Sequence, residues 1–166
     1  MQIRSSHHKD FPRILDVIND AAEAYRGVIP ADRWHEPYMS MDSLSEEIEA
    51  GVHFWVAEQD TELTGVMGIQ DRDEVALIRH AYVISAVQGE GIGKRMLQHV
   101  LRQSSKRILV GTWAAASWAV RFYQRNGFVL FDEEEKNHAL SKYWNIPDRQ
   151  IETSVVLEYQ NNLEIE

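Results

Sequence analysis

A glycine-rich turn, Gln88–Gly93, separates a strand-like segment from an amphipathic helix and constrains the fold more than any other feature of this chain. The preceding segment, residues 75–83, is largely apolar and rich in β-branched and aromatic residues, which predicts a buried strand. From Ile92 onward, apolar residues recur at helical spacing. A helix that begins directly after glycines presents unpaired backbone N–H groups at the positive end of its dipole, and such an arrangement binds phosphate groups. The turn therefore predicts an anion site at the start of a central helix.

The charge distribution marks the same segment. The chain carries 17 Lys+Arg and 26 Asp+Glu, a formal net charge of -9. Residues 88–125 hold seven of the bases and one acid, so this segment carries +6 and the remainder -15. A basic segment in an acidic protein favours an anionic ligand at that place. The overall acidity argues against nucleic acid as a partner.

Size and composition limit the class of protein. With 166 residues, 44% of them hydrophobic, the chain is expected to form one domain spanning residues 1–166. It has no cysteine, which excludes disulfides, thiolate metal ligands and a cysteine nucleophile. The seven histidines form no metal-binding pair, so we expect no metal. No apolar run is long enough to cross a bilayer and the N-terminus lacks a signal-peptide pattern, so we expect a cytoplasmic protein without a membrane partner.

The apolar pattern predicts the element order β-α-α-β-β-β-α-β-α-β-β and one α/β domain whose mixed sheet is covered by helices on both faces. Asp10 is expected to cap the first helix, which should run to Tyr25. Ser43 and Glu46 are spaced as a capping box in the second helix. Residues 132–148 are expected to form a loop. Strands are expected near residues 1–4, 53–58, 63–70, 75–83, 108–112, 128–131 and 153–159, and helices near 10–25, 41–50, 92–102 and 117–125.

Two motifs in this order, Gln88-x-x-Gly91-x-Gly93 and Phe122-Tyr123-x-x-x-Gly127-Phe128, resemble the GNAT superfamily of acyl-CoA-dependent N-acyltransferases. A P-loop or a dinucleotide fingerprint fits the glycine spacing worse. The resemblance covers nearly the whole chain through its element order. It implies a mostly antiparallel sheet of about seven strands, two of which splay at the cofactor site, and acetyl-CoA as the acyl donor. It also implies direct transfer to the primary amine of a small molecule or peptide, and it is compatible with a homodimer.

The resemblance further implies which residues contact coenzyme A. In such proteins the loop amides hold the pyrophosphate, the strand before the loop pairs with the pantetheine arm, and the helix with the Phe-Tyr pair packs against that arm. The implied contacts are Ala81, Tyr82, Val83, Gln88, Gly89, Glu90, Gly91, Ile92, Gly93, Lys94, Ser117 and Tyr123. Several positions depart from the family pattern: Ala116 replaces a frequent asparagine, and Leu77 replaces a frequent glutamate base. In the loop, Gln88 stands where an arginine is frequent, and Glu90 brings a negative side chain near the phosphates.

The resemblance places Tyr123 near the sulfur as a proton donor, although a packed structural tyrosine is the alternative. The general base is open. His80 has a suitable unperturbed pKa, but strand alternation is expected to place it on the face opposite Leu77, and a structural histidine is the alternative. Glu74, acting through water, is the next candidate. An amine that arrives neutral needs no base.

The acyl acceptor is expected to enter between residues 26–38 and 132–148. Trp34, His35, Tyr38 and Trp144, together with Tyr143, form an aromatic set that can enclose an acceptor, and Glu36 can meet a cation. The alternative is a satellite core of aromatic residues beneath long loops. A second function also stays open: because Leu77 and Ala116 depart from the family pattern, the chain can be a CoA-binding regulatory or partner module without catalysis.

Overall fold

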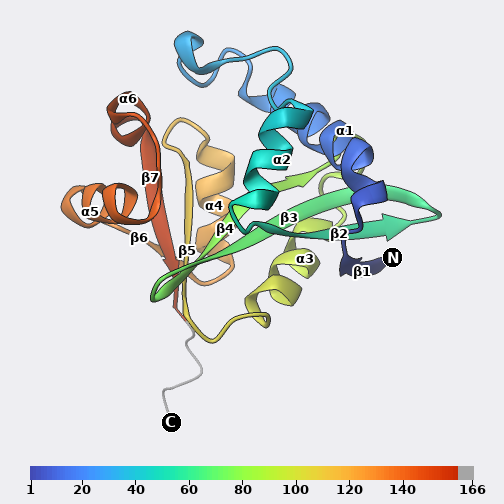
Figure 1. Ribbon diagram of the computed structural model, residues 1–166. Helices are drawn as coiled ribbons and strands as arrows, with labels where there is room; N and C mark the ends of the chain where they lie inside the picture. Colours follow the sequence, from blue (N-terminus) through green and yellow to red (C-terminus); the bar gives the residue numbers. More distant parts are fainter. Residues whose placement is uncertain (161–166) are drawn as a thin grey trace.

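A seven-stranded mixed sheet forms the centre of the molecule, in the order β1-β2-β3-β4-β5-β7-β6 (Figure 1). The computed structural model describes residues 1–160. Along the sheet the strands are β1 Gln2–Ser5, β2 His53–Gln59, β3 Glu62–Arg72, β4 Val75–Val83, β5 Arg107–Trp113, β7 Ser154–Tyr159 and β6 Phe128–Leu130. Neighbouring strands are antiparallel except β4 and β5, which are parallel. The expected mixed, mostly antiparallel sheet of about seven strands is confirmed.

Helices cover both faces of this sheet, as expected (Figure 1). The α-helices are α1 Phe11–Ala21, α2 Met41–Glu49, α3 Ile92–Leu101, α4 Ser117–Arg125, α5 Glu133–Tyr143 and α6 Asp148–Glu152. Successive residues of β4 show the two layers, because Leu77 packs with α5 while Ile78 packs with α3. Packing contacts place α1, α2 and α5 on one face and α3 and α4 on the other. In residues 1–160, no helix has the length and apolarity that a membrane span requires.

Two predicted helix caps are wrong. α2 begins one residue after Ser40, whose Oγ accepts a hydrogen bond from the Ser43 N–H at 3.1 Å, so Ser43 and Glu46 form no capping box. This start turns Leu44 fully into the core. Asp10 stands at the N-cap position of α1, but its carboxylate makes no capping hydrogen bond to that helix. It accepts the His7 N–H at 2.8 Å, as part of a capping box of the 3₁₀ turn His8–Asp10, and pairs with Arg4.

The predicted loop over residues 132–148 is wrong, because most of it is α5 and α6 begins at its end. Asp132 and Glu135 form the capping box of α5: the Asp132 side chain accepts the Glu135 N–H at 2.8 Å, and the Glu135 side chain accepts the Asp132 N–H at 3.2 Å. The first helix is shorter than predicted, since α1 ends at Ala21 and a 3₁₀ turn, η2 Ala22–Tyr25, follows.

The sheet opens between β4 and β5. Their pairing stops at Ile78 and Val110, and beyond this point the strands diverge, so that β5 and β7 run at a steep angle to β2 and β3 (Figure 1). The remainder of β4 has a free edge, and the expected splay is confirmed. A β-bulge lies in the same stretch: Tyr82 opposes Val66 and Arg79 opposes Gly68, which leaves two β4 residues opposite one residue of β3.

Candidate active site

A groove of about 630 Å³ runs along the free edge of β4 to the start of α3, with α4 on its other side. Ten of the twelve residues predicted to contact the cofactor line it: Ala81, Tyr82, Val83, Gln88, Gly89, Gly91, Ile92, Gly93, Lys94 and Tyr123. Glu90 and Ser117 are exposed and do not line the groove; its α4 wall is formed instead by Trp118, Ala119 and Phe122.

The turn before α3 presents a row of free backbone donors. None of the N–H groups of residues 89–94 has a hydrogen-bond partner within residues 1–160. Gly89 and Gly91 have φ of +87° and +83°, the left-handed region that favours glycine, and a Cβ at either position would meet nothing within 4 Å. Glycine is therefore required here for its backbone angle and not for space. The Gln88 side chain donates to the Val83 carbonyl at 3.0 Å and fixes the turn to the end of β4.

These donors fit a pyrophosphate. Successive N–H groups at a helix start form an anion-binding concavity, and the helix dipole adds partial positive charge. Lys94 and Arg125 line the same groove and add two full charges. The groove can therefore hold an elongated ligand with its phosphate end at α3 and an arm along the free edge of β4.

Tyr123 lies inside the groove on α4. Its side chain is 5% exposed and packs edge-on against Phe122 and Phe128, with ring centroids 5.2 Å apart in each case. Its hydroxyl has no hydrogen-bond partner within residues 1–160, and the oxygen is not among the buried unpartnered polar atoms, so it is accessible from the groove that Tyr123 lines. Burial, and to a lesser extent Tyr25, raises the pKa of Tyr123 above its ordinary value. The phenol therefore keeps its proton at neutral pH and can donate it to a ligand.

A second cavity of about 140 Å³ occupies the opening between β4 and β5. Five aromatic side chains line it: Tyr25, Tyr38, Tyr82, Trp113 and Trp144. Trp144 packs on Gly111 of β5, where a Cβ would approach its ring to 3.2 Å, and the Trp113 indole donates to the Tyr38 hydroxyl at 3.3 Å. Burial is the main cause that raises the pKa of Tyr25 to about 12. Because Tyr25 and Tyr82 line both cavities, the two meet at this pair.

His80 lines the second cavity, and the prediction of its face is wrong. The bulge gives His80 a φ of +56° and interrupts the strand alternation. Its imidazole Nε2 lies 3.0 Å from a carboxylate oxygen of Glu47, on the last turn of α2, so His80 is on the same face as Leu77. Arg79 also approaches Glu47, at 3.4 Å; it lies two residues after Leu77 and reaches this face by regular strand alternation, whereas His80 reaches it through the bulge.

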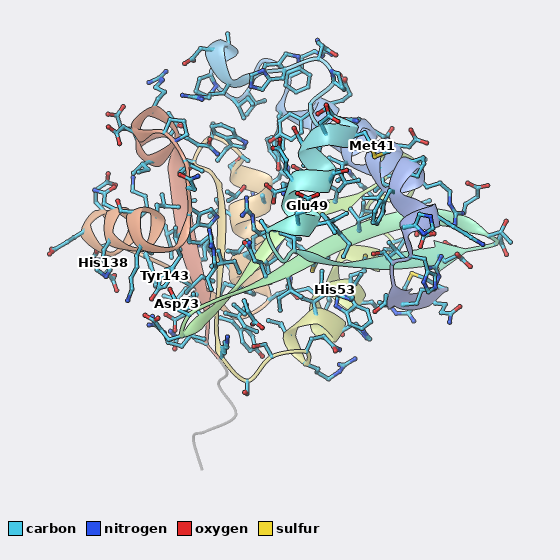
Figure 2. All side chains as sticks on the ribbon, in the orientation of Figure 1. Met41, Glu49, His53, Asp73, His138 and Tyr143 are labelled. Atoms are coloured by element: carbon cyan, nitrogen blue, oxygen red, sulfur yellow. The ribbon has the colours of Figure 1, made fainter. Side chains whose placement is uncertain are left out.

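Other predicted residues lie elsewhere. Glu74 is in the β3–β4 turn, where it accepts hydrogen bonds from Lys142 and Tyr143, and these bonds lower its pKa to about 2. Figure 2 shows Tyr143 beside this turn, where Asp73 is labelled. Glu74 and Tyr143 line neither cavity. The structure therefore does not bring Glu74 together with Tyr123 and His80.

The predicted acceptor residues divide into two groups. Tyr38 and Trp144 line the second cavity, whereas Trp34 and His35 do not. Trp34 packs against Tyr38 with ring centroids 5.8 Å apart and donates its indole N–H to Glu36 at 2.9 Å. His35 is exposed. Glu36 already meets a cation of this chain, since it pairs with Arg26.

Sequence reasoning missed four residues of these cavities and their surroundings: Tyr25, Glu47, Trp113 and Trp118. No local signal marks Glu47, because its contact with His80 spans 33 positions. Trp118 stacks on Tyr25, with ring centroids 5.9 Å apart, and both line the groove. Among residues 1–160, no group of three or more His, Asp or Glu side chains is placed to hold a metal ion.

Comparisons with known proteins agree with this geometry. A family model described as an acetyltransferase (GNAT) domain matches residues 19–142. A GNAT-family acetyltransferase from Staphylococcus aureus Mu50 superposes with a TM-score of 0.72 at 16% identity, over 95% of this chain and 97% of that one. The PaiA N-acetyltransferase from Thermoplasma acidophilum, solved with coenzyme A, gives 0.72 at 18% identity, over 96% and 98%. A ribosomal-protein-alanine N-acetyltransferase from Brucella melitensis gives 0.67 at 17%, over 97% and 100%. No curated protein sequence matches the chain.

Proposed function

Because the chain belongs to the GNAT acetyltransferase family, we propose that it transfers the acetyl group of acetyl-CoA to a primary amine of a small molecule or peptide by direct attack. One observation carries the proposal: a row of free N–H groups at the start of α3 and an unpartnered phenol on α4 line the same groove. The first suits a pyrophosphate and the second suits a departing thiolate. The complex of the similar Thermoplasma protein with coenzyme A supports the choice of donor.

The donor is proposed to bind through the backbone of residues 88–94 and the free edge of β4 at Ala81, Tyr82 and Val83. Lys94 and Arg125 add charge at the phosphate end. Acetyl-CoA supplies an activated acyl group, whose transfer requires a neutral amine, a polarised carbonyl and a proton for the sulfur. The carbonyl oxygen is stabilised by main-chain N–H groups that β5 leaves unpaired beyond Ile78.

Two side chains are proposed to move protons. His80 takes one proton from the ammonium group of the acceptor, and the free amine then attacks the carbonyl carbon. As the carbon–sulfur bond breaks, Tyr123 gives its phenolic proton to the sulfur. The Tyr123 phenolate then takes the second proton of the new amide nitrogen and becomes a phenol again, and His80 releases its proton to solvent. The balance is one amide, one thiol and one proton for each ammonium and thioester consumed.

The acceptor is proposed to lie in the cavity between β4 and β5. This cavity has five aromatic residues, Arg79 and His80 in its wall, and no carboxylate among its lining residues. Aromatic faces attract an ammonium group and pack against an apolar body. An acceptor with one amine on an apolar body therefore suits this cavity better than a polycation. Trp34 and His35, outside the cavity, are proposed to contact the exposed end of the acceptor.

Calorimetry with acetyl-CoA tests the first half of the proposal, and absence of heat at millimolar ligand would refute it. A panel of primary amines and peptides, followed by release of free CoA, tests the second half. We expect at least one amine in the panel to increase CoA release well above the rate of hydrolysis.

A second candidate, a CoA-binding module without catalysis, is favoured by one observation: Leu77 is fully buried against α5 at the position where relatives often carry a base. Binding of acetyl-CoA without turnover on any amine would support this function. Measured transfer to any amine would exclude it.

A further inference from the structure

A carboxylate on α2 holds the imidazole of His80. The Glu47 carboxylate lies 3.0 Å from His80 Nε2, and the exposed fractions of the two side chains are 24% and 17%. Glu47 is in the last turn of α2, whose two ends, Met41 and Glu49, are labelled in Figure 2. The pair joins two elements on the α2 face of the sheet, and His80 is one of the residues that line the acceptor cavity.

The backbone is built around this contact. His80 has a φ of +56°, a conformation that costs energy for a residue with a Cβ and is common at functional sites. Regular strand alternation would direct the side chain toward α3, away from Glu47. The bulge opposite Met67 therefore brings the imidazole to the face where it meets the Glu47 carboxylate, and His80 also lines the acceptor cavity.

The charged and titratable groups around the pair come from β3, β4, η2 and the connection before α2. On β4, Arg79 approaches Glu47 at 3.4 Å and donates to the Gln70 side chain at 3.1 Å. Arg72 of β3 also acts on Glu47, and the phenols of Tyr25, Tyr38 and Tyr82 line the cavity. Burial alone would raise the pKa of Glu47, but the hydrogen bond to His80 and the positive charges of Arg79 and Arg72 lower it. Glu47 is thus a carboxylate at neutral pH and accepts from Nε2–H.

We propose that Glu47 is a positioning residue for His80: it holds the imidazole with the proton on Nε2 and leaves Nδ1 free to accept a proton from the acceptor amine. This inference rests on the proposed acetyl transfer. A carboxylate that accepts from one ring nitrogen fixes the tautomer and stabilises the imidazolium formed when the other nitrogen is protonated. Nδ1 takes one proton from R–NH₃⁺, and the neutral amine keeps the electron pair that attacks the carbonyl carbon. The proton leaves His80 for solvent after product release.

A structural salt bridge between Glu47 and Arg79 is the competing explanation. Both readings predict that loss of Glu47 changes stability. Only the positioning role predicts a change in the pH profile of turnover.

The test compares Glu47→Gln with Glu46→Gln, which removes the same charge from an exposed neighbouring position on α2. Imidazole ¹H–¹⁵N correlation spectra of the CoA-free protein report the tautomer of His80 without turnover. Turnover is measured as CoA release from acetyl-CoA with 2-phenylethylamine, an aromatic primary amine that suits the cavity. In Glu47→Gln we expect the Nε2–H tautomer of His80 to lose its preference and the acid limb of kcat/KM to move to lower pH by about one unit, because the carboxylate that fixes the ring and favours a protonated base is lost. We expect kcat to fall about tenfold and both Glu46→Gln readouts to match the wild type.

A double variant checks that Glu47 acts through His80. His80→Asn is the suitable partner, because asparagine tolerates a positive φ better than other residues with a Cβ. In the His80→Asn background, Glu47→Gln should leave kcat/KM unchanged at every pH. An unchanged tautomer of His80 or an unchanged pH profile in Glu47→Gln alone, or a further loss in the double variant, overturns the role of Glu47. A wild type that acetylates none of the panel amines overturns the proposed function instead.

Discussion

Tyr123→Phe removes a single hydroxyl and tests whether that oxygen serves catalysis or stability. The hydroxyl has no partner within residues 1–160, so its removal leaves no donor or acceptor of the folded protein unsatisfied. The ring keeps its edge-on contacts with Phe122 and Phe128. We therefore expect the free energy of unfolding to change by less than about 1 kcal/mol.

Turnover should respond much more strongly. If the phenol protonates the departing thiolate, the variant loses a hydrogen bond to a charged group that exists only as the carbon–sulfur bond breaks. Such a bond is worth about 1.5–3 kcal/mol, which corresponds to a loss of about 10- to 150-fold in kcat. The dissociation constant of acetyl-CoA should change little, because the thioester offers the phenol no charge before reaction. The assays are CoA release under saturating donor, calorimetry with acetyl-CoA, and urea unfolding.

Tyr143→Phe is the matched control. Tyr143 is equally buried, at 6% exposed, but its hydroxyl donates to Glu74 at the β3–β4 turn, outside both cavities. This variant should lower Tm and leave kcat unchanged, the opposite pattern to Tyr123→Phe. A Tyr123→Phe protein with kcat within twofold of the wild type would refute the reasoning, as would an equal loss of kcat in the control.

Three further predictions concern the fold and the donor groove. Gly91 has a φ of +83° and open space for a Cβ, so Gly91→Ala should cost about 1–2 kcal/mol of stability through backbone strain and lower the affinity for acetyl-CoA about tenfold, as measured by calorimetry. Gly51→Ala is the control: at a φ of +99° in the α2–β2 turn, it should cost similar stability without changing this affinity. Gly68→Ala should destabilise the protein by about 1–3 kcal/mol in urea, because its Cβ would lie 2.7 Å from Val52 Cγ1 and 2.8 Å from the Arg79 carbonyl oxygen, and no loss would show that the bulge relaxes freely. Asp10→Asn should cost about 2–3 kcal/mol at pH 7. The hydrogen bond from Arg4, with those from His7 and Arg13, holds the pKa of Asp10 well below its usual value. The stabilisation is therefore complete above the pKa of Asp in the unfolded chain, near 4, and is lost as the pH falls below it. A difference in stability from the wild type that persists unchanged at pH 2 would contradict this.

The sheet and four of the helices could be predicted from the sequence because their signals are local. β4 is a continuous apolar segment, and α3 carries apolar residues at helical spacing directly after a glycine turn. α5 was missed because only a few of its side chains face the core, chiefly Ala139, Leu140 and Tyr143, while its first turn is acidic. Its capping box, Asp132 with Glu135, was the available signal and went unused.

The donor groove could largely be predicted from the sequence and most of the acceptor cavity could not, for the same reason. The groove is built largely from one continuous segment, residues 81–94, so its residues could be named in advance. The acceptor cavity collects Tyr25, Trp113 and Gln150 from separate elements, and no spacing in the sequence relates them. The face of His80 depends on the register between β3 and β4, where a glycine at position 68 lets the Arg79 carbonyl approach closely. Pairing across the sheet, and not the residues around His80, decides that bulge.

The opening of the sheet explains how one strand serves both substrates. The donor groove lies mainly on the α3 and α4 face, while Arg79 and His80 direct the acceptor cavity to the α2 and α5 face. A closed sheet would separate the two by its own backbone. Since β5 leaves β4 after Ile78, only the Tyr25–Tyr82 boundary remains between them. In the proposed reaction the amine and the thioester would then approach from opposite faces of the sheet, with the proposed base and the proposed proton donor on different sides of the reacting carbon. That separation suits the chemistry, because a base beside Tyr123 would compete for the proton that the thiolate needs.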